Sequence, residues 1–426
     1  MPKITNIAPG FDIEDVSSGK IDEISKEKSE FEKKVVKNEP KISPNKGGKK
    51  TGYFIPQQKE QQRKILVVIL AVVAVLFALW VFLVKPGKIQ SKKVVKPSES
   101  ESALDGGIKV EADLTGEIFP EENSSWSKER PFAVMVNNHT DARPQSGLIY
   151  ADLVYEIVAE GGITRFLAFF QTKTPEKIGP VRSTREYYLV LVKELGDAML
   201  MHIGYSPQAL VAIDTWPVRS LFRGGCESFQ GCTWRDNPRN VAYEHTAYTN
   251  GEKLRELSIS LGWEGKGDIR VYKFKDNNNK YSSKPSASKI SIDFWNKGDY
   301  SSIFEYNQSN NTYLKFTGYD SSGNPIPHKD QEETDKQIEV KNLIVQFAVE
   351  NSIAGDDKGR LDYQLIGSGK ALVFIDGKVV DATWSKADRD DRTLFYDTDG
   401  NEIEFNRGKF WISIVPDRNV DQVVYN

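Results

Sequence analysis

The chain has 426 residues, and its 57 Lys and Arg residues against 60 Asp and Glu residues leave a formal net charge of −3. Proteins dedicated to nucleic acid carry a strong basic excess, so this balance argues against nucleic acid as a partner. Two cysteines and four histidines exclude a disulfide-dense scaffold and a multi-cysteine metal centre. The sequence predicts no metal and no cofactor.

Residues 1–64 contain 14 basic and 10 acidic residues, a net charge of +4, and few residues suited to a core. This composition is typical of a disordered tail, and a short helix that docks on a cytoplasmic partner is the alternative. The chain after residue 84 carries a net charge of −7. That charge argues against binding of polyanions through net charge alone.

Residues 65–84 read ILVVILAVVAVLFALWVFLV, a run of 20 apolar residues without charge, Gly or Pro. A helix of this length spans about 30 Å, the thickness of a bilayer core, so the run predicts a transmembrane helix with the lipid bilayer as its partner. Seven basic residues precede it and five follow it, which favours a cytoplasmic N-terminus. We therefore expect a single-pass membrane protein whose folded part is extracytoplasmic.

Residues 85–120 are rich in Lys and Ser and then acidic, without apolar periodicity, which predicts a linker. From residue 121 onward, aromatic and β-branched residues become dense. Strand-like and helix-like patterns alternate up to residue 265, so residues 121–265 predict a layered, mixed α/β domain. Its expected elements are strands at 131–139 and 198–206, a hairpin at 153–171 around Gly161-Gly162, and helices at 182–195, from Pro207, and at 250–261.

Residues 266–426 contain short strand-like runs separated by turn pairs such as Asp376-Gly377 and Asp399-Gly400. Long helical patterns are absent from this part of the sequence. It predicts a second, mostly β domain. The expected fold class is therefore α+β or mixed α/β, with one N-terminal transmembrane helix.

Polar residues gather where the apolar runs of the first domain end. The segment GPVRSTR at 179–185 is the most suggestive, because a Gly-Pro turn that enters a helix offers backbone N–H groups, and arginines bind carboxylate or phosphate. A structural network in which the arginines pair with nearby carboxylates is the alternative. The candidate ligand-binding residues are Asn138, His139, Arg143, Glu160, Thr164, Arg165, Arg182, Ser183, Arg185 and His245.

The histidines and cysteines give weaker signals. His139, His202 and His245 together with Glu156 or Glu160 would suit an acid–base site, but no tight metal-binding spacing occurs, and a structural role is the alternative for His202. Cys226 and Cys232 are close in sequence and suit a local disulfide outside the membrane. The sequence leaves catalytic residues unassigned.

Three motifs, RPQSG at 143–147, EGGITR at 160–165 and GPVRS at 179–183, carry a family resemblance. Together with 367–386, 395–403 and 411–416 they resemble the YerB-like family, domain of unknown function 3048, over roughly residues 120–420. The resemblance implies a bacterial, envelope-attached protein, usually a lipoprotein, with a layered α/β first domain. It brings no established reaction. This chain differs by its transmembrane run and its long N-terminal tail.

These observations favour an envelope binding or scaffold module with an Arg-lined pocket for an anionic or carboxylate-bearing ligand. A cell-wall component or another envelope protein is the expected partner. An envelope hydrolase with Glu160 or His139 as general base is one alternative, and a sensor that couples the ectodomain to the tail is another.

Overall fold

The computed structural model describes residues 108–276 and 280–426. The predicted cytoplasmic tail and transmembrane helix, and the predicted linker up to residue 107, lie outside the described residues. Within the described ranges, no helix combines the length and apolarity that a membrane span requires. The described structure begins inside the segment predicted as a linker. There, β1 (Lys109–Glu111) and β2 (Ile118–Pro120) pair as a hairpin, and Leu114 between them is fully buried.

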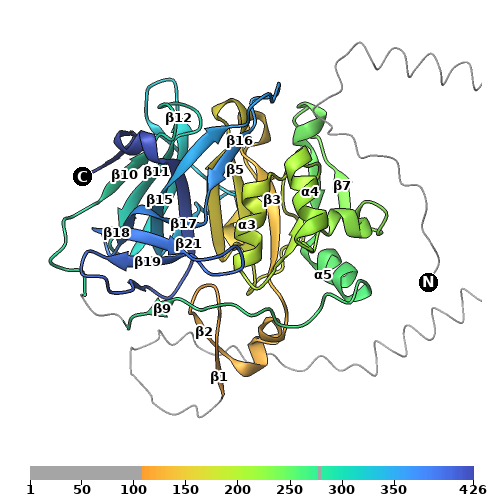
Figure 1. Cartoon of the computed structure of the whole chain (residues 1–426), viewed down its shortest axis with the longest axis horizontal. Coiled ribbons are helices and arrows are strands. Elements are labelled where there is room, and N and C mark those ends of the chain that lie inside the picture. The colour runs from red at the N-terminus through yellow and green to blue at the C-terminus, as the bar shows by residue number, and fades with distance from the viewer. Residues whose placement is uncertain (1–107, 277–279) are drawn as a thin grey trace, which may run out of the picture. The chain divides into compact units, whose positions relative to one another are not determined.

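A ten-stranded sheet forms the centre of the fold (Figure 1). Apolar residues dominate its inner strands, and every residue of β3, β4 and β5 is buried. The strand order is β19 (Leu394–Asp397), β18 (Lys378–Lys386), β17 (Gly367–Ile375), β15 (Asn342–Ser352), β21 (Phe410–Pro416), β4 (Leu153–Val158), β5 (Thr164–Phe170), β3 (Phe132–Asn137) and β6 (Met199–Met201), with β16 (Leu361–Gln364) paired to β15.

The last long strand, β21, joins the two halves of the chain. It runs parallel to β15 on one side and to β4 on the other, with Trp411 opposite both Leu343 and Val154. The sheet therefore continues from the second predicted domain into the first, and the described residues fall within one compact unit. The domain boundary near residue 265 therefore remains a prediction from the sequence.

Three α-helices lie on the side of the molecule that carries β3 (Figure 1): α3 (Glu186–Glu194), α4 (Pro207–Thr215) and α5 (Gly251–Ser260). Side chains cap α4 and α5, because Ser206 Oγ accepts from Ala209 N and Asn250 Oδ1 accepts from Lys253 N. Helix α3 begins later than predicted. Arg185 is its extended N-cap residue, and no side chain caps it.

A second, six-stranded antiparallel sheet lies beside those strands of the central sheet that come from residues 266–426. Its strands are β13 (Pro325–Pro327), β12 (Thr312–Tyr319), β11 (Ser302–Asn307), β10 (Lys289–Ile292) and β22 (Val423–Tyr425), with β14 (Glu339–Val340) paired to β12. Short pairs complete the fold: β7 (Thr233–Arg235) with β8 (Ala247–Thr249), and β9 (Lys273–Phe274) with β20 (Glu404–Phe405). The predicted mixed α/β class is confirmed.

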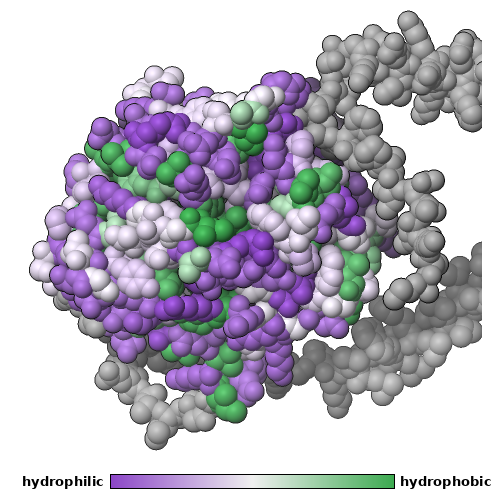
Figure 2. Space-filling view, in the orientation of Figure 1, coloured by the Kyte–Doolittle hydropathy of each residue, from purple (hydrophilic) through white to green (hydrophobic). Residues whose placement is uncertain are grey.

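The face seen in Figure 2 is mostly hydrophilic, with small scattered apolar patches.

Candidate functional site

Three of the predicted site residues, Glu160, Arg165 and Arg185, form an internal ion cluster. Arg165 donates to Glu160 Oε2 at 2.9 Å, and Arg185 forks onto both oxygens of the same carboxylate. Burial alone would raise the pKa of Glu160, but the charges of Arg165 and Arg185 outweigh it and lower that pKa to about 2. Arg165 also donates to the carbonyl of Ser183. Glu160 therefore engages Arg165 and Arg185, and of the two arginines in the GPVRSTR segment it is Arg185 that pairs with this carboxylate.

Asn138, Arg143 and Thr164 belong to a second, buried network. Asn138 donates to Thr164 Oγ1 at 2.7 Å and accepts from Arg143 Nε at 3.0 Å. Gln145 also donates to Asn138 Oδ1, and His328 donates from Nε2 to the Gln145 oxygen at 2.8 Å. These bonds tie the end of β3 to the loop after β13.

Glu156 on β4 is the centre of this network. Its carboxylate accepts from Thr164 Oγ1 (2.9 Å), Ser302 Oγ (2.6 Å) and Trp411 Nε1 (3.0 Å). Lys315 on β12 donates to Ser302 Oγ at 2.7 Å, and its Nζ lies 3.6 Å from Oε2 of Glu156. Both charged side chains are fully buried. Burial lowers the pKa of Lys315 to about 8, against the opposing charge of Glu156. This pair fastens the second sheet to the central sheet.

His139 and His245 meet at the surface end of β3. Their rings stack with centroids 4.5 Å apart and planes 13° apart. Asn137 Oδ1 accepts from the His139 backbone N–H, so Asn137 Nδ2 donates to Nδ1 of His245 at 2.8 Å. Burial lowers the pKa of His245, and His139 and Arg182 lower it further. The structure thus brings three predicted residues together, His139, Arg182 and His245.

One candidate metal-ligand group lies here. Donor atoms of His139, Asp141 and His245 fall within 4.8 Å of one another. In this conformation, however, the two rings are stacked, so their in-plane nitrogen lone pairs lie in nearly parallel planes. The Nδ1 atoms also have hydrogen bonds already: that of His139 accepts from Asp141 N, and that of His245 accepts from Asn137. Metal binding to both imidazoles would require rearrangement of these hydrogen bonds.

The expected acid–base pair of a glutamate and a histidine is not formed among the described contacts. Glu156 and Glu160 bind the partners given above. His202 donates from Nδ1 to the Gly204 carbonyl at 2.8 Å, so Nε2 of the neutral ring accepts from the Ser220 hydroxyl at 2.8 Å. His202 is fully buried, and burial lowers its pKa to about 4. Both ring nitrogens of His202 thus have partners within the protein.

A cleft of about 700 Å³ lies away from these networks. Trp234 and Tyr150 supply aromatic walls, and Lys177 is fixed between Asp236 (2.9 Å) and Glu332 (3.0 Å). Within the part of the chain that the structure describes, the cleft is also lined by Lys173, Thr174, Pro175, Glu176 and Asn250. The sequence analysis missed this cleft, because its residues come from five separate segments and carry no shared motif.

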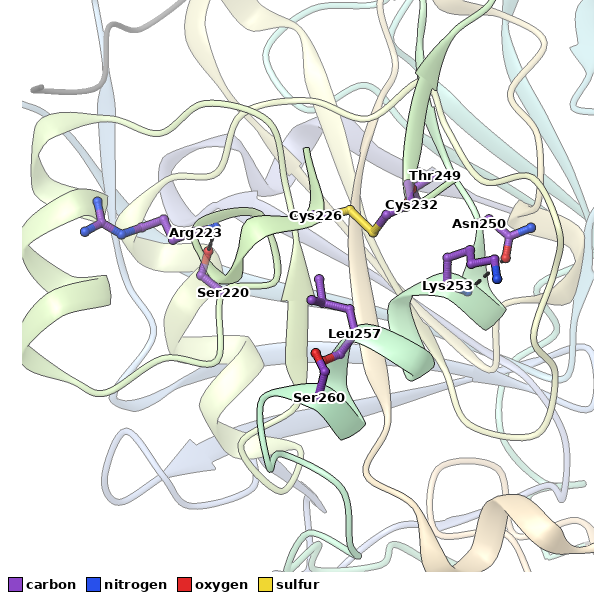
Figure 3. The surroundings of a disulfide bond; sticks show 9 residues. All are labelled: Ser220, Arg223, Cys226, Cys232, Thr249, Asn250, Lys253, Leu257 and Ser260. Carbon is purple, nitrogen blue, oxygen red and sulfur yellow. Dashed lines mark hydrogen bonds between the residues drawn. A yellow bond between two sulfur atoms is a disulfide. The ribbon is translucent and has the colours of Figure 1, made fainter. Parts of the chain in front are cut away.

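A disulfide between Cys226 and Cys232 supports the cleft (Figure 3). The Cys232 carbonyl accepts from Thr249 Oγ1 at 2.7 Å and from the backbone N–H of Asn250 at 3.3 Å. Asn250 both lines the cleft and caps α5. The disulfide thus fixes the start of β7, which carries Trp234, next to the start of α5.

The sequence matches two domain families, described as the N-terminal domain (residues 114–264) and the C-terminal domain (residues 290–412) of "Protein of unknown function (DUF3048)". A Bacillus subtilis (strain 168) protein named "Putative lipoprotein YerB" is 31% identical over 324 residues, which cover 76% of this chain and 92% of that protein. A crystal structure of YerB from Bacillus subtilis is similar, with a TM-score of 0.61 and 31% identity, over 75% of this chain and 100% of that one. The chain belongs to the DUF3048, or YerB-like, family, which confirms the resemblance seen in the motifs.

Proposed function

We propose that this protein is an extracytoplasmic binding module of the bacterial cell envelope, anchored by a transmembrane helix at residues 65–84. The apolar run and its basic flank support this topology. The relative from Bacillus subtilis is named a lipoprotein, and lipoproteins are held by a lipid on cysteine. Here both cysteines of the sequence are bonded to each other, so a helix takes the place of the lipid.

The ligand of this module is a saccharide-bearing cell-wall component that binds in the 700 Å³ cleft. The observation that carries this proposal is the combination of two aromatic walls with fixed polar groups. A sugar ring has an apolar face that packs on an aromatic ring and hydroxyl groups that need paired donors and acceptors. Two lysines and two glutamates line the cleft, so their charges cancel and a neutral, hydroxyl-rich ligand suits it better than a polyanion.

Calorimetric titration of the full chain in detergent micelles with the tetramer of N-acetylglucosamine tests this proposal. Trp234→Ala should weaken binding about tenfold, since loss of one aromatic contact is worth about 1.4 kcal/mol. Tyr243→Ala is the matched control, because Tyr243 is 61% exposed and lies outside the described lining. Absence of binding by the unmodified protein would contradict the saccharide. Equal weakening in both variants would contradict the cleft as the site.

A protease added to intact, wall-stripped cells tests the topology. We expect the protease to degrade residues 108–426 and to leave the N-terminal tail, residues 1–64, intact. Protection of the folded part would place it in the cytoplasm and refute the assigned orientation.

A further inference from the structure

A second cleft of about 430 Å³ opens where the end of α3 meets the loop between β18 and β19. Glu194 comes from α3, Ser385 from β18, and Arg392 from the loop. Exposed aspartates, among them Asp268 and Asp391, also line it. None of these residues belongs to the sites described above.

Three charged side chains are buried at the base of this cleft, and their charges do not cancel. Glu194 is 1% exposed, Lys386 1% and Arg392 4%. One Glu194 oxygen accepts from Lys386 Nζ at 3.0 Å and from Thr393 Oγ1 at 2.7 Å, and the other accepts from the hydroxyl of Tyr155. Glu194 and Lys386 thus form a saturated pair. Arg392 is a second buried cation near this one carboxylate, which accepts no hydrogen bond from it.

The guanidinium of Arg392 makes no hydrogen bond with the described part of the protein through Nε or either terminal nitrogen. The guanidinium lies over the ring of Tyr272, with Cζ 4.1 Å from the ring centroid, and Glu194 and the Tyr272 hydroxyl are among its electrostatic partners. Burial raises the pKa of Tyr272 to about 12, so this phenol is neutral and supplies no counter-charge. Buried charges in proteins are normally paired, and an unpaired guanidinium that lines a cleft needs an external acceptor.

We propose that this cleft binds a small zwitterion, an amino acid or a short peptide, whose carboxylate accepts hydrogen bonds from Arg392. A planar guanidinium offers two parallel N–H groups, which match a carboxylate. The exposed carboxylates of Asp268 and Asp391 on the same cleft suit the ammonium group of such a ligand and disfavour a plain anion. The volume fits a ligand of one or two residues.

Calorimetric titration of the full chain in detergent micelles with the dipeptide alanylalanine, and separately with acetate and inorganic phosphate, tests this inference. The dipeptide should bind at least about tenfold more tightly than either anion. Arg392→Met should weaken dipeptide binding roughly 100-fold, because charge-assisted hydrogen bonds are lost. Arg389→Met, on the same loop but outside the described lining, is the matched control and should bind normally.

Two further measurements separate a binding role from a structural one. Without ligand, Arg392→Met should melt at the same temperature as the unmodified protein or higher, because an uncompensated buried charge is removed. The double variant Asp268→Asn/Asp391→Asn should weaken binding of the dipeptide and leave that of acetate unchanged. Unfolding of Arg392→Met, normal dipeptide binding by it, or phosphate binding as tight as that of the dipeptide would each overturn the proposal.

Discussion

The buried pair of Glu156 and Lys315 allows the sharpest test of how this fold is held together. Glu156→Gln keeps the shape of the side chain but removes its charge, and so leaves the ammonium group of Lys315 buried without a counter-ion. Both side chains are fully buried. Loss of one partner of a buried ion pair costs about 3–5 kcal/mol, which is a large part of the stability of a typical domain.

The pH dependence of this loss follows from the pKa of Lys315. Its folded-state pKa, about 8, lies below its ordinary value of 10.5. The unfolded chain therefore binds the proton more tightly, and the contribution of Lys315 to stability rises as pH increases from about 8 to about 10.5, by roughly 3 kcal/mol. Glu156→Gln lowers this pKa further. The variant therefore loses this proton at a lower pH than the unmodified protein, so its deficit should be largest at acidic pH, shrink as pH rises toward 8 and change little above pH 8.

Urea unfolding of the full chain in detergent micelles, followed by tryptophan fluorescence, measures these free energies. The double variant Glu156→Gln/Lys315→Met is the control, because replacing both members of a buried pair by uncharged groups is often close to neutral. It should recover most of the loss. A deficit of Glu156→Gln below about 1 kcal/mol, or a double variant no more stable than the single one, would refute a stabilising charge pair.

Three further outcomes are expected. Glu160 has a pKa of about 2 against an ordinary 4.5, so its stabilisation of roughly 3 kcal/mol is present above pH 4.5 and is lost as pH falls toward 2; acid unfolding of Glu160→Gln should lack this loss. His202 has a pKa of about 4 against 6.5, so the protein should lose roughly 3 kcal/mol between pH 6.5 and 4, and His202→Gln, compared by urea unfolding at both pH values, should show a smaller change. Cys226→Ser/Cys232→Ser opens a short loop with a sequence separation of six and should lower the free energy of unfolding by about 2 kcal/mol, as measured by urea unfolding; an unchanged midpoint would argue against any role of the disulfide in stability.

Local patterns in the sequence predicted much of the secondary structure. Continuous apolar runs predicted the fully buried strands β3 and β4. The Gly161-Gly162 pair predicted the turn between β4 and β5, and both glycines adopt the positive φ that such a turn requires. The helices predicted from Pro207 and at 250–261 correspond to α4 and α5, whose N-caps are Ser206 and Asn250. Helix α3 begins after its predicted start at residue 182, because Thr184 forms a β-bridge with Tyr205 and Arg185 is in extended backbone.

The candidate site shows the limit of such reasoning. Glu160, Arg165 and Arg185 were recognised as chemically important, but whether the arginines face a ligand or a carboxylate of the protein depends on distances that no local pattern contains. Arg392 lies in a polar loop that carries no motif, and its unpaired charge emerges only when α3 supplies Glu194 and β18 supplies Lys386.

The sequence by itself determined the apolar run at 65–84, the family, the alternation of elements and the residues with chemical potential, because these depend on composition and on neighbours along the chain. Tertiary structure alone decided that β21 lies between β15 and β4, that Glu160 pairs with Arg165 and Arg185, and that Lys315 meets Glu156. The physical reason is that a charge finds its partner through space. Pairing between distant segments sets which charges are satisfied internally, and which, like Arg392, remain available for a ligand.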